Sequence, residues 1–346
     1  MENIAEINLL GTGGGYGECI VMHLGNGDWI IVDSCINPTS NEIIPLKLLA
    51  DKGINPDQVK LIICSHWHDD HIRGISEILK SCTNATFVYA RANDLQKFLR
   101  FLFLDYKKIK TSSSNSSTEE FNKCLNVLSE TKRVQKLANC DKLLYSNKQG
   151  EDKIEVWALS PSEKSSLLFD EEISRLITDF GPPNKKLPKI SANDRSVVIF
   201  IKLVNEVILL GADLEVNNDE NLGWNDIILN SQVTKDSNKA SYFKIPHHGS
   251  KNGYHKDIWS VLISNDPIGT LTPWNRSLKL PQGEMVEKYK SLTKELYITS
   301  PLVVSKKPKK RDRNTEKAIR QFNSTIRELK YQLGIITSQI DLNNPK

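Results

Sequence analysis

Residues 65–74 of the chain have the sequence SHWHDDHIRG and contain three of its seven histidines. They follow directly on Val59–Cys64, a nearly all-apolar run that predicts a strand covered on both faces. If the loop after this strand curls, His66 and His68 can both point at one ion, because imidazole suits zinc, manganese and iron. Asp70 adds a carboxylate to this set. The stretch therefore predicts a metal site at the C-terminal end of a strand.

Two more histidines, His247 and His248, lie in the segment KIPHHGS at 244–250. They follow a strand predicted at 242–246. Five of the seven histidines therefore lie in two short segments, each just after an apolar strand. A single histidine in a polar loop is usually a surface residue, but packing does not explain two such clusters. The two segments together favour one metal centre.

Strands alternate with helices along much of the chain, which predicts an α/β protein built in layers. Strands are expected at 7–10, 18–24, 29–33, 59–64, 86–90, 154–159, 196–204, 207–210, 242–246, 268–272 and 296–304. Helices are expected at 43–52, 74–82, 93–108, 119–138 and 165–178. Residues 91–190 are mainly helical in pattern and are interpreted as an insertion into a core fold. Apolar residues near helical spacing predict an amphipathic helix at 314–340.

The composition, 39% hydrophobic and 25% charged, is that of a soluble globular protein. The N-terminus does not resemble a secretory signal, and no apolar run approaches the ~18 residues of a spanning helix, so no membrane association is expected. The six cysteines form no CxxC pair, which favours reduced thiols in the cytoplasm. The net charge is +4, but residues 306–320 alone carry +6 and the rest of the chain −2. Attraction to nucleic acid by charge therefore depends on that basic segment.

Several motifs, in a consistent order, resemble those of the metallo-β-lactamase fold family. Residues 65–74 resemble its HxHxDHxxG signature. Residues 30–33 (IIVD) resemble the motif in which an acidic residue, here Asp33, ends a strand and braces the histidine loop. Residues 209–213 (LLGAD) resemble the motif whose aspartate bridges two metals, and residues 244–250 resemble the last metal motif.

The resemblance extends over about residues 7–275, with 91–190 largely uncovered. It implies an α/β fold, a four-layer αββα metallo-β-lactamase sandwich over residues 1–304 with a mainly helical insertion at about 91–190. Residues 305–346 are then expected to form a basic linker and a C-terminal amphipathic helix.

Within the family, the chain is most similar to the β-lactamase-like domains of ComEC-type competence proteins and their soluble relatives. Residues 15–18 (GYGE) resemble their early turn, in which glycines precede an acidic residue. Residues 193–196 (NDRS), followed by a strand, resemble their NxxS element, and the doubled histidine of HHGS is typical of them. This branch implies a phosphodiester substrate.

The resemblance also implies a role for each residue of the centre. A first divalent ion is bound by His66 and His68, a second by Asp70, His71 and His248, and Asp213 bridges both. Zinc is expected ahead of manganese. His247 is expected beside the metals, in contact with the substrate or leaving group; which of His247 and His248 is the ligand stays open, with His248 preferred. No histidine lies between His71 and His247, where many relatives have a further ligand, so Asn193 or water is expected there.

These roles imply a binuclear metal-dependent hydrolase, a phosphodiesterase acting on nucleic acid or a phosphorylated small molecule. A hydroxide bridging the metals is the nucleophile, Asp70 can accept a proton, and His247 can protonate the leaving group. Supporting roles or substrate contacts are expected for Asp33, Asn193, Ser196, Trp274, Asn275 and Arg276. Trp274 suits base stacking and Arg276 suits phosphate pairing, although Trp274 equally suits a core or rim position. The basic run at 306–313 suits a polyanion, and a solvated linker equally well.

Two other functions are compatible with the sequence. The metal centre alone also allows a hydrolase of a small carboxylic ester, lactone or thioester. The missing histidine and the predicted amphipathic tail allow a non-catalytic scaffold or sensor subunit with a degenerate metal site. Such a subunit would bind a protein partner through the insertion or the C-terminal helix.

Overall fold

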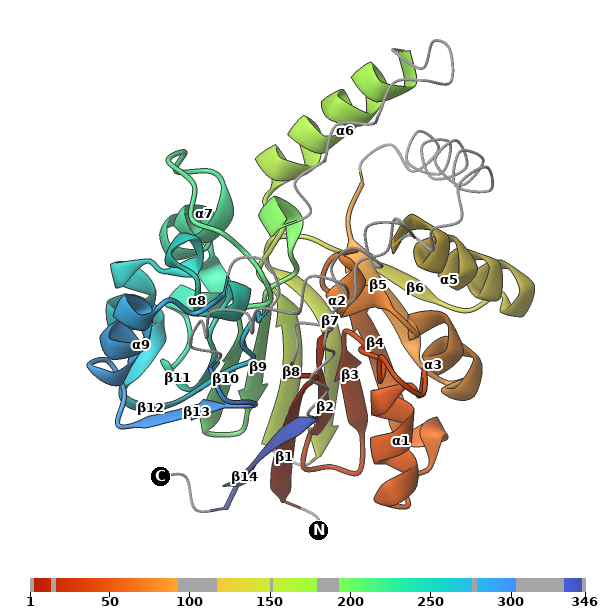
Figure 1. Cartoon of the computed structure of the whole chain (residues 1–346), viewed down its shortest axis with the longest axis horizontal. Helices are drawn as coiled ribbons and strands as arrows, with labels where there is room; N and C mark the ends of the chain where they lie inside the picture. Colours follow the sequence, from red (N-terminus) through yellow and green to blue (C-terminus); the bar gives the residue numbers. More distant parts are fainter. Residues whose placement is uncertain are drawn as a thin grey trace, which may run out of the picture.

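The computed structural model describes residues 3–13, 17–92, 117–149, 152–178, 193–275, 279–302 and 333–343. These residues form two seven-stranded sheets packed face to face, with helices on both outer sides (Figure 1). The expected four-layer αββα architecture is confirmed. In the described part of the chain, no helix is long and apolar enough to cross a membrane.

The first sheet has the strand order β14-β1-β2-β3-β4-β5-β6. Its strands are β1 (Ile4–Gly11), β2 (Glu18–His23), β3 (Trp29–Val32), β4 (Val59–Cys64), β5 (Thr86–Ala90), β6 (Gln135–Ala138) and β14 (Gly334–Asp341). Strands β3 to β6 run parallel to one another, and the pairs β14–β1, β1–β2 and β2–β3 are antiparallel. The turn between β2 and β3 has Gly27 at φ 87°, which glycine adopts without steric cost.

The second sheet has the order β13-β12-β11-β10-β9-β8-β7. Its strands are β7 (Lys142–Gln149), β8 (Asp152–Ala158), β9 (Ile199–Leu203), β10 (Glu206–Leu210), β11 (Ala240–Lys244), β12 (Ile263–Leu271) and β13 (Glu295–Ile298). Strands β7 to β10 pair antiparallel, and β10 to β13 pair parallel. In each sheet, therefore, the strands that precede the predicted metal ligands form a parallel pair.

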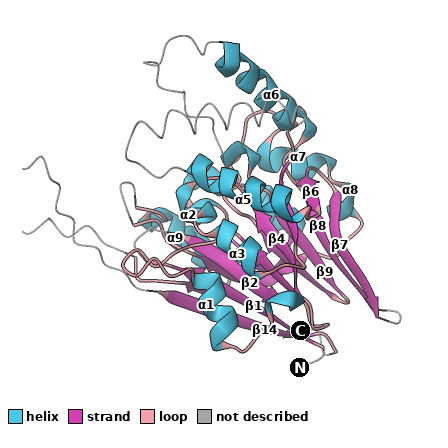
Figure 2. Ribbon diagram, turned by 90° about the vertical axis from the view of Figure 1, so that its right-hand side faces the viewer, coloured by secondary structure: helices cyan, strands magenta, loops and turns pink. Residues whose placement is uncertain are grey.

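Three apolar cores hold the layers together. The central core fills the space between the sheets. A second core lies under α1 (Ile44–Asp51), α3 (Ile75–Ser81) and α5 (Ser117–Thr131), which cover the first sheet (Figure 2). The third lies under α7 (Gly223–Asn230) and α9 (Gly283–Lys290), which cover the second sheet. The remaining described helices are α2 (Asp69–Ile72), α6 (Glu163–Thr178) and α8 (Gln232–Lys235).

The expected insertion over 91–190 is wrong as a single unit. β6 completes the first sheet, and β7 and β8 belong to the second. The helix predicted at 119–138 ends with α5 at Thr131, and β6 follows it. β6 and β7 are edge strands with half-exposed side chains, so their sequences lack the apolar run that marks a buried strand. The helix predicted at 93–108 lies outside the described residues.

The predicted C-terminal helix is also wrong over 334–340, which lie in β14. This strand pairs antiparallel with the whole of β1, from Ile4 opposite Asp341 to Gly11 opposite Gly334. Ile336 and Ile340 pack against the central core. Their spacing of four places them on one face of a helix and of a strand alike, so the hydrogen bonds offered by β1 decide the outcome. The earlier part of that helix, 314–332, and the basic run 306–313 lie outside the described residues.

Candidate metal centre

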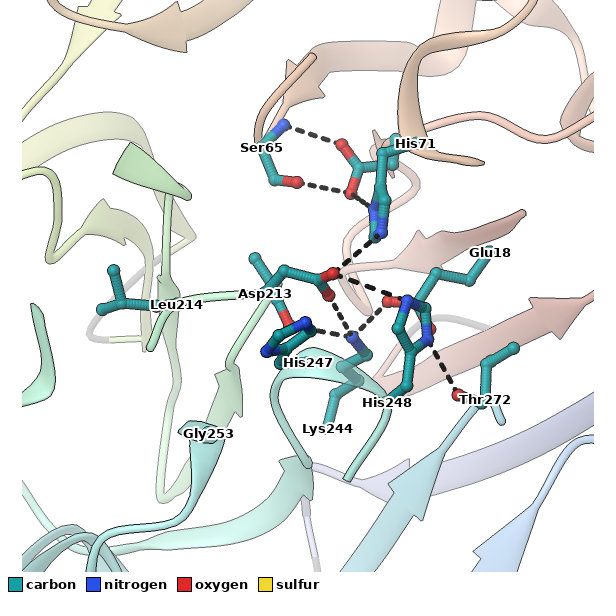
Figure 3. Close-up of polar contacts among 12 residues, drawn as sticks. Glu18, Ser65, His71, Asp213, Leu214, Lys244, His247, His248, Gly253 and Thr272 are labelled. Atoms are coloured by element: carbon teal, nitrogen blue, oxygen red, sulfur yellow. Dashed lines mark hydrogen bonds and ion pairs between the residues drawn. The ribbon is translucent and has the colours of Figure 1, made fainter. Parts of the chain in front are cut away.

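The candidate site lies where two pairs of parallel strands end. β3 and β4 are neighbours in the first sheet, and β10 and β11 are neighbours in the second. Parallel neighbours end at the same edge of a sheet, so the segments that follow them meet. Asp33 follows β3, Ser65 follows β4, Asp213 follows β10, and the pair His247 and His248 follows β11. Figure 3 shows these segments facing one another.

Asp33 is a buried carboxylate that holds the histidine loop. It accepts hydrogen bonds from the Ser65 N–H at 2.7 Å, from Ser65 Oγ at 2.6 Å and from His71 Nδ1 at 2.8 Å. Burial raises the pKa of Asp33, and the contacts with His71 and Ser65 partly offset that rise. Because Nδ1 of His71 donates to Asp33, its Nε2 faces the centre as the potential metal-binding atom.

Four side chains converge beside this brace. His71 Nε2 lies 3.6 Å from Asp70 Oδ2 and 3.6 Å from Asp213 Oδ2. His248 Nε2 lies 3.3 Å from Asp70 Oδ2 and 3.5 Å from Asp213 Oδ2. In the described part of the chain, the buried atoms His71 Nε2 and Asp213 Oδ1 have no hydrogen-bond partner. Two imidazole nitrogens and two carboxylates at these separations fit a divalent ion, whose bonds to such atoms are ~2.0–2.2 Å long.

The four groups also shift one another's protonation. Burial lowers the pKa of His71, but Asp213 and Asp70 raise it to well above its ordinary value. Burial likewise lowers the pKa of His248, and the same two carboxylates outweigh it. For Asp70 and Asp213 burial raises the pKa, but the two histidines hold both values below the ordinary range. The carboxylates therefore stay ionised, and a metal ion can replace the protons on the histidines.

The two histidines of the HHG turn point into different surroundings. His247, His248 and Gly249 have φ values of 47°, 53° and 72°, and a left-handed backbone is strained for the two histidines. His248 Nδ1 donates to the Thr272 carbonyl at 3.0 Å, so its Nε2 is the atom turned toward Asp70. The structure thus places His248, the preferred alternative, in the cluster of potential ligands.

His247 lies in a separate polar cluster. Its Nδ1 lies 3.0 Å from Ser250 Oγ and 3.2 Å from Glu215 Oε1. Asn193 Nδ2 lies 3.3 Å from His247 Nε2 and donates to Glu215 Oε1 at 2.9 Å. Asn193 therefore contacts His247 and Glu215. Glu215 does not stand out in the sequence; the only signal is its place two residues after Asp213.

His66 and His68 lie next to the four converging side chains. His66 Nε2 is 3.9 Å from Asp213 Oδ2 and 3.2 Å from His68 Nδ1. Burial lowers the pKa of both histidines, which favours the neutral ring that metals bind. Within the described residues, three groups have potential ligand atoms that all lie within 4.8 Å of one another; His66 belongs to one and His68 to none. The structure brings His66 close to Asp213 and leaves His68 at the periphery.

A buried ion pair between Glu18 and Lys244 stands behind Asp213 (Figure 3). Lys244 donates to Glu18 Oε1 and, at 3.0 Å, to the Ala212 carbonyl, and its Nζ lies 3.9 Å from Asp213 Oδ1. Burial would lower the pKa of Lys244, but the carboxylates of Glu18 and Asp213 raise it, so the ammonium stays charged. The available sequence signal was a lysine at the end of an otherwise apolar strand.

Ser196 lies next to a backbone contact with the histidine loop. Its side chain is fully buried, and its carbonyl accepts a hydrogen bond from Ser160 Oγ at 2.6 Å. The next residue, Val197, donates its N–H to the Ser65 carbonyl at 2.9 Å. This segment therefore ties the second sheet to the loop that contains the first histidines.

Trp274 forms part of the wall beside the centre. Its ring centroid lies 5.5 Å from that of His248, with 33° between the ring planes. The neighbouring Asn275 donates from Nδ2 to the Gly13 carbonyl at 2.8 Å, which links this loop to the residues that follow β1. Arg276, expected to pair with phosphate, lies outside the described residues.

One family model and several solved structures match the chain. The family model of the metallo-beta-lactamase superfamily matches residues 12–97, which include the histidine loop. The chain is similar to the metallo-beta-lactamase fold protein YhfI from Bacillus subtilis, with 10% identity over 86% of this chain and 97% of that chain and a TM-score of 0.45. It is also similar to the short form of human tRNase Z, with 10% identity over 86% of this chain and 96% of that chain and a TM-score of 0.35. Comparison with curated proteins gives no match. The two mixed sheets between helical layers are the α/β metallo-β-lactamase fold.

Proposed function

We propose that this chain is a binuclear metal-dependent hydrolase of the metallo-β-lactamase fold that cuts phosphodiesters. The observation that supports this most strongly is the convergence of Asp70, His71, Asp213 and His248 on one buried volume. Two imidazoles and two carboxylates form a donor set that suits zinc and also manganese, and we expect zinc. The ComEC-like sequence features, including the doubled histidine, favour a phosphodiester over other esters.

The ligand atoms divide into two sets. We assign Asp70, His71 and His248 to one ion, His66 and His68 to the other, and Asp213 to both. The first set is better formed, because its nitrogens lie 3.3–3.6 Å from the facing carboxylate oxygens, whereas His66 Nε2 is 3.9 Å from Asp213 Oδ2. We therefore expect the first set to fill at lower metal concentration.

Bound ions supply Lewis acidity, which activates water as a nucleophile and polarises the bond to be cut. The chain's own residues keep the ligands ready for this. Asp33 accepts a hydrogen bond from Nδ1–H of His71, and the Thr272 carbonyl accepts one from Nδ1–H of His248. Nε2 of each ring therefore faces the centre. Buried partners of this kind fix the tautomer and the ring orientation of each histidine.

His247 is the proposed proton donor to the leaving oxygen. Ser250 and Glu215 hold its Nδ1, so Nε2 is the ring atom that exchanges a proton with the substrate. That atom faces the Asn193 amide at 3.3 Å in this structure, and a leaving oxygen must take the place of this contact. General acid catalysis of this kind typically contributes ~10²–10⁴-fold to the rate.

We propose a nucleic acid, or a phosphorylated small molecule with an aromatic base, as the substrate. Trp274 is only partly buried and lies beside His248, where its ring can stack on a base next to the cut phosphate. Stacking of this kind is worth roughly 1–3 kcal/mol per base. A Trp274→Ala variant should therefore raise KM for an oligonucleotide and leave KM for bis(p-nitrophenyl) phosphate less affected.

The central test is hydrolysis by the purified protein with Zn²⁺ or Mn²⁺, combined with elemental analysis. The substrates are bis(p-nitrophenyl) phosphate and labelled DNA and RNA. Asp70→Ala should abolish turnover. Asp69→Ala is the matched control, because Asp69 lies in the same loop but pairs with Arg73 at 2.7 Å, with 41% of its side chain exposed. A wild type that binds metal and cuts no phosphodiester would refute the proposal.

Salt dependence distinguishes the alternatives. Affinity for nucleic acid should fall steeply as salt rises, whereas affinity for a small carboxylic ester, lactone or thioester should not. Turnover of such an ester with no phosphodiester cleavage would favour the small-ester hydrolase. A metal-poor protein that turns over neither class and co-purifies with a protein partner in fixed ratio would favour the scaffold.

A further inference from the structure

Glu18 and Lys244 connect the two sheets directly behind the centre. Glu18 is the first residue of β2 in the first sheet, and Lys244 is the last residue of β11 in the second. Their side chains are 4% and 2% exposed. A buried ion pair contributes little net stability, because desolvation offsets the attraction. Stability therefore does not account for this pair, and its place beside Asp213 suggests another role.

The two carboxylate oxygens of Asp213 face different partners. Oδ2 faces the metal-binding side, at 3.6 Å from His71 Nε2, 3.5 Å from His248 Nε2 and 3.9 Å from His66 Nε2. Oδ1 lies 3.9 Å from the ammonium of Lys244. The ammonium thus stands beside the oxygen that has no hydrogen bond in the described part of the chain, while all three histidines approach the other.

Glu18 and Ala212 hold the ammonium from its other side. Lys244 donates to Glu18 Oε1 and to the Ala212 carbonyl at 3.0 Å. Ala212 directly precedes Asp213, so the same ammonium restrains the backbone and one carboxylate oxygen of this aspartate. Without such a restraint, a carboxylate can rotate and present either oxygen, or both, to a metal. Groups behind metal ligands commonly set ligand orientation in this way.

We propose that Glu18 and Lys244 are a positioning pair for Asp213. Lys244 retains Oδ1, so that Asp213 presents Oδ2 alone to the ions, and Glu18 cancels the charge of the ammonium so that it does not repel them. This inference rests on the proposed function, because it takes Asp213 as a metal ligand. Glu18 lies within 4.8 Å of His71 and Asp213, but its Oε1 accepts from Lys244, so the proposal assigns it to the positioning of Asp213. It makes metal affinity and coordination, measured without substrate, depend on this pair.

The first measurement is metal affinity by calorimetric titration with Zn²⁺. Glu18→Gln leaves the ammonium of Lys244 without its carboxylate, and affinity should fall about 10–100-fold, the usual effect of losing such a supporting group. The double variant Glu18→Gln/Lys244→Met removes both charges and keeps the net charge of the wild type. Its affinity should also stay below that of the wild type, because Asp213 is no longer held.

The second measurement is the visible absorption of the protein saturated with Co²⁺, which reports the number and kind of ligands. The double variant should change this spectrum, since Asp213 is free to use Oδ1. A variant that is only less stable would keep the wild-type spectrum at saturation. The matched control is Glu6→Gln/Lys52→Met, which removes another Glu–Lys pair, 2.8 Å apart, whose carboxylate also accepts from Asn8 and Gln339. It should leave both affinity and spectrum unchanged.

The outcomes separate the possible errors. Wild-type affinity and spectrum in both Glu18 variants would overturn the proposal. Full recovery of affinity in the double variant would mean that the pair acts by charge alone, which also overturns it. If Glu18→Gln does not fold, Glu18→Asp replaces it, and wild-type affinity there counts equally against the pair. A wild type that binds metal but cuts no phosphodiester refutes only the proposed function, whereas one that binds no metal refutes both.

Discussion

Replacing Asp33 with asparagine tests whether the carboxylate behind the histidine loop sets the metal-binding form of His71. Asparagine has nearly the same shape and tolerates the left-handed φ of 62° at this position. Asp33 Oδ2 accepts from both Ser65 Oγ at 2.6 Å and His71 Nδ1 at 2.8 Å. An amide that keeps its oxygen toward the Ser65 N–H points its NH₂ at His71 Nδ1, where two donors then face each other.

The ring of His71 must then either move its proton to Nε2, which blocks metal binding, or keep Nδ1–H without an acceptor. A hydrogen bond to a charged group is worth about 1.5–3 kcal/mol, and about 1.4 kcal/mol corresponds to a tenfold change in affinity. Zinc affinity should therefore fall roughly 10–100-fold, in line with the usual effect of such supporting carboxylates.

The assay is competition for Zn²⁺ with a chromophoric chelator at neutral pH. Asp69→Asn is the matched control, since it makes the same substitution in the histidine loop at an exposed, ion-paired position. Circular dichroism and thermal unfolding show whether both variants fold. Wild-type affinity in Asp33→Asn, or an equal loss in Asp69→Asn, would show that Asp33 does not act through His71.

Three further predictions follow from the described residues. The fold raises the pKa values of His71 and His248. In the metal-free protein these two histidines therefore contribute fully to stability below their pKa in the unfolded chain, about 6.5, and the contribution is lost as pH rises through their pKa values in the folded protein. The urea midpoint of metal-free protein should therefore fall above neutral pH, and a flat profile would contradict the charge balance of the centre. Five of the six cysteines are buried, and Cys140 is half-buried, with its pKa raised to about 12 by burial and nearby acids. The native protein should therefore react slowly with iodoacetamide, and first at Cys140. Mass spectrometry of the labelled peptides would reveal any other order. Leu342 follows β14, is 7% exposed and packs in the central core, so Leu342→Ala should cost about 2–5 kcal/mol in urea unfolding. Ile335 lies in β14 and is 47% exposed, so Ile335→Ala should cost under ~1 kcal/mol. Equal costs would mean that this terminal segment does not contribute to the core.

The architecture could be predicted where strands are buried on both faces. Val59–Cys64 is such a strand, because nearly every residue in it is apolar and the pattern needs no partner to be recognised. The edge strands β7 and β14 gave no such signal. Lys142–Gln149 and Gly334–Asp341 are half-exposed, and their sequences are compatible with loop or helix. They become strands because a neighbouring strand offers unpaired backbone groups, which depends on the whole sheet.

Within the site, the residue types could be predicted from the sequence and the contacts between them could not. The residue types of the metal centre follow from the sequence, because His66 to His71 lie within a few residues of one another at the end of a buried strand. That Asn193 contacts His247 and Glu215 became visible only from side-chain positions. The same holds for the HHG turn, where three successive positive φ values separate the two histidines.

The sequence by itself determined the kind of chemistry, since metal-binding residue types at short spacing are a local property of the chain. Only the tertiary structure decided how that chemistry is oriented. Glu18 and Lys244 are 226 residues apart, and they meet because β2 and β11 belong to sheets that pack face to face. Contacts across such a separation depend on the packing of both sheets, which no short segment of the chain encodes.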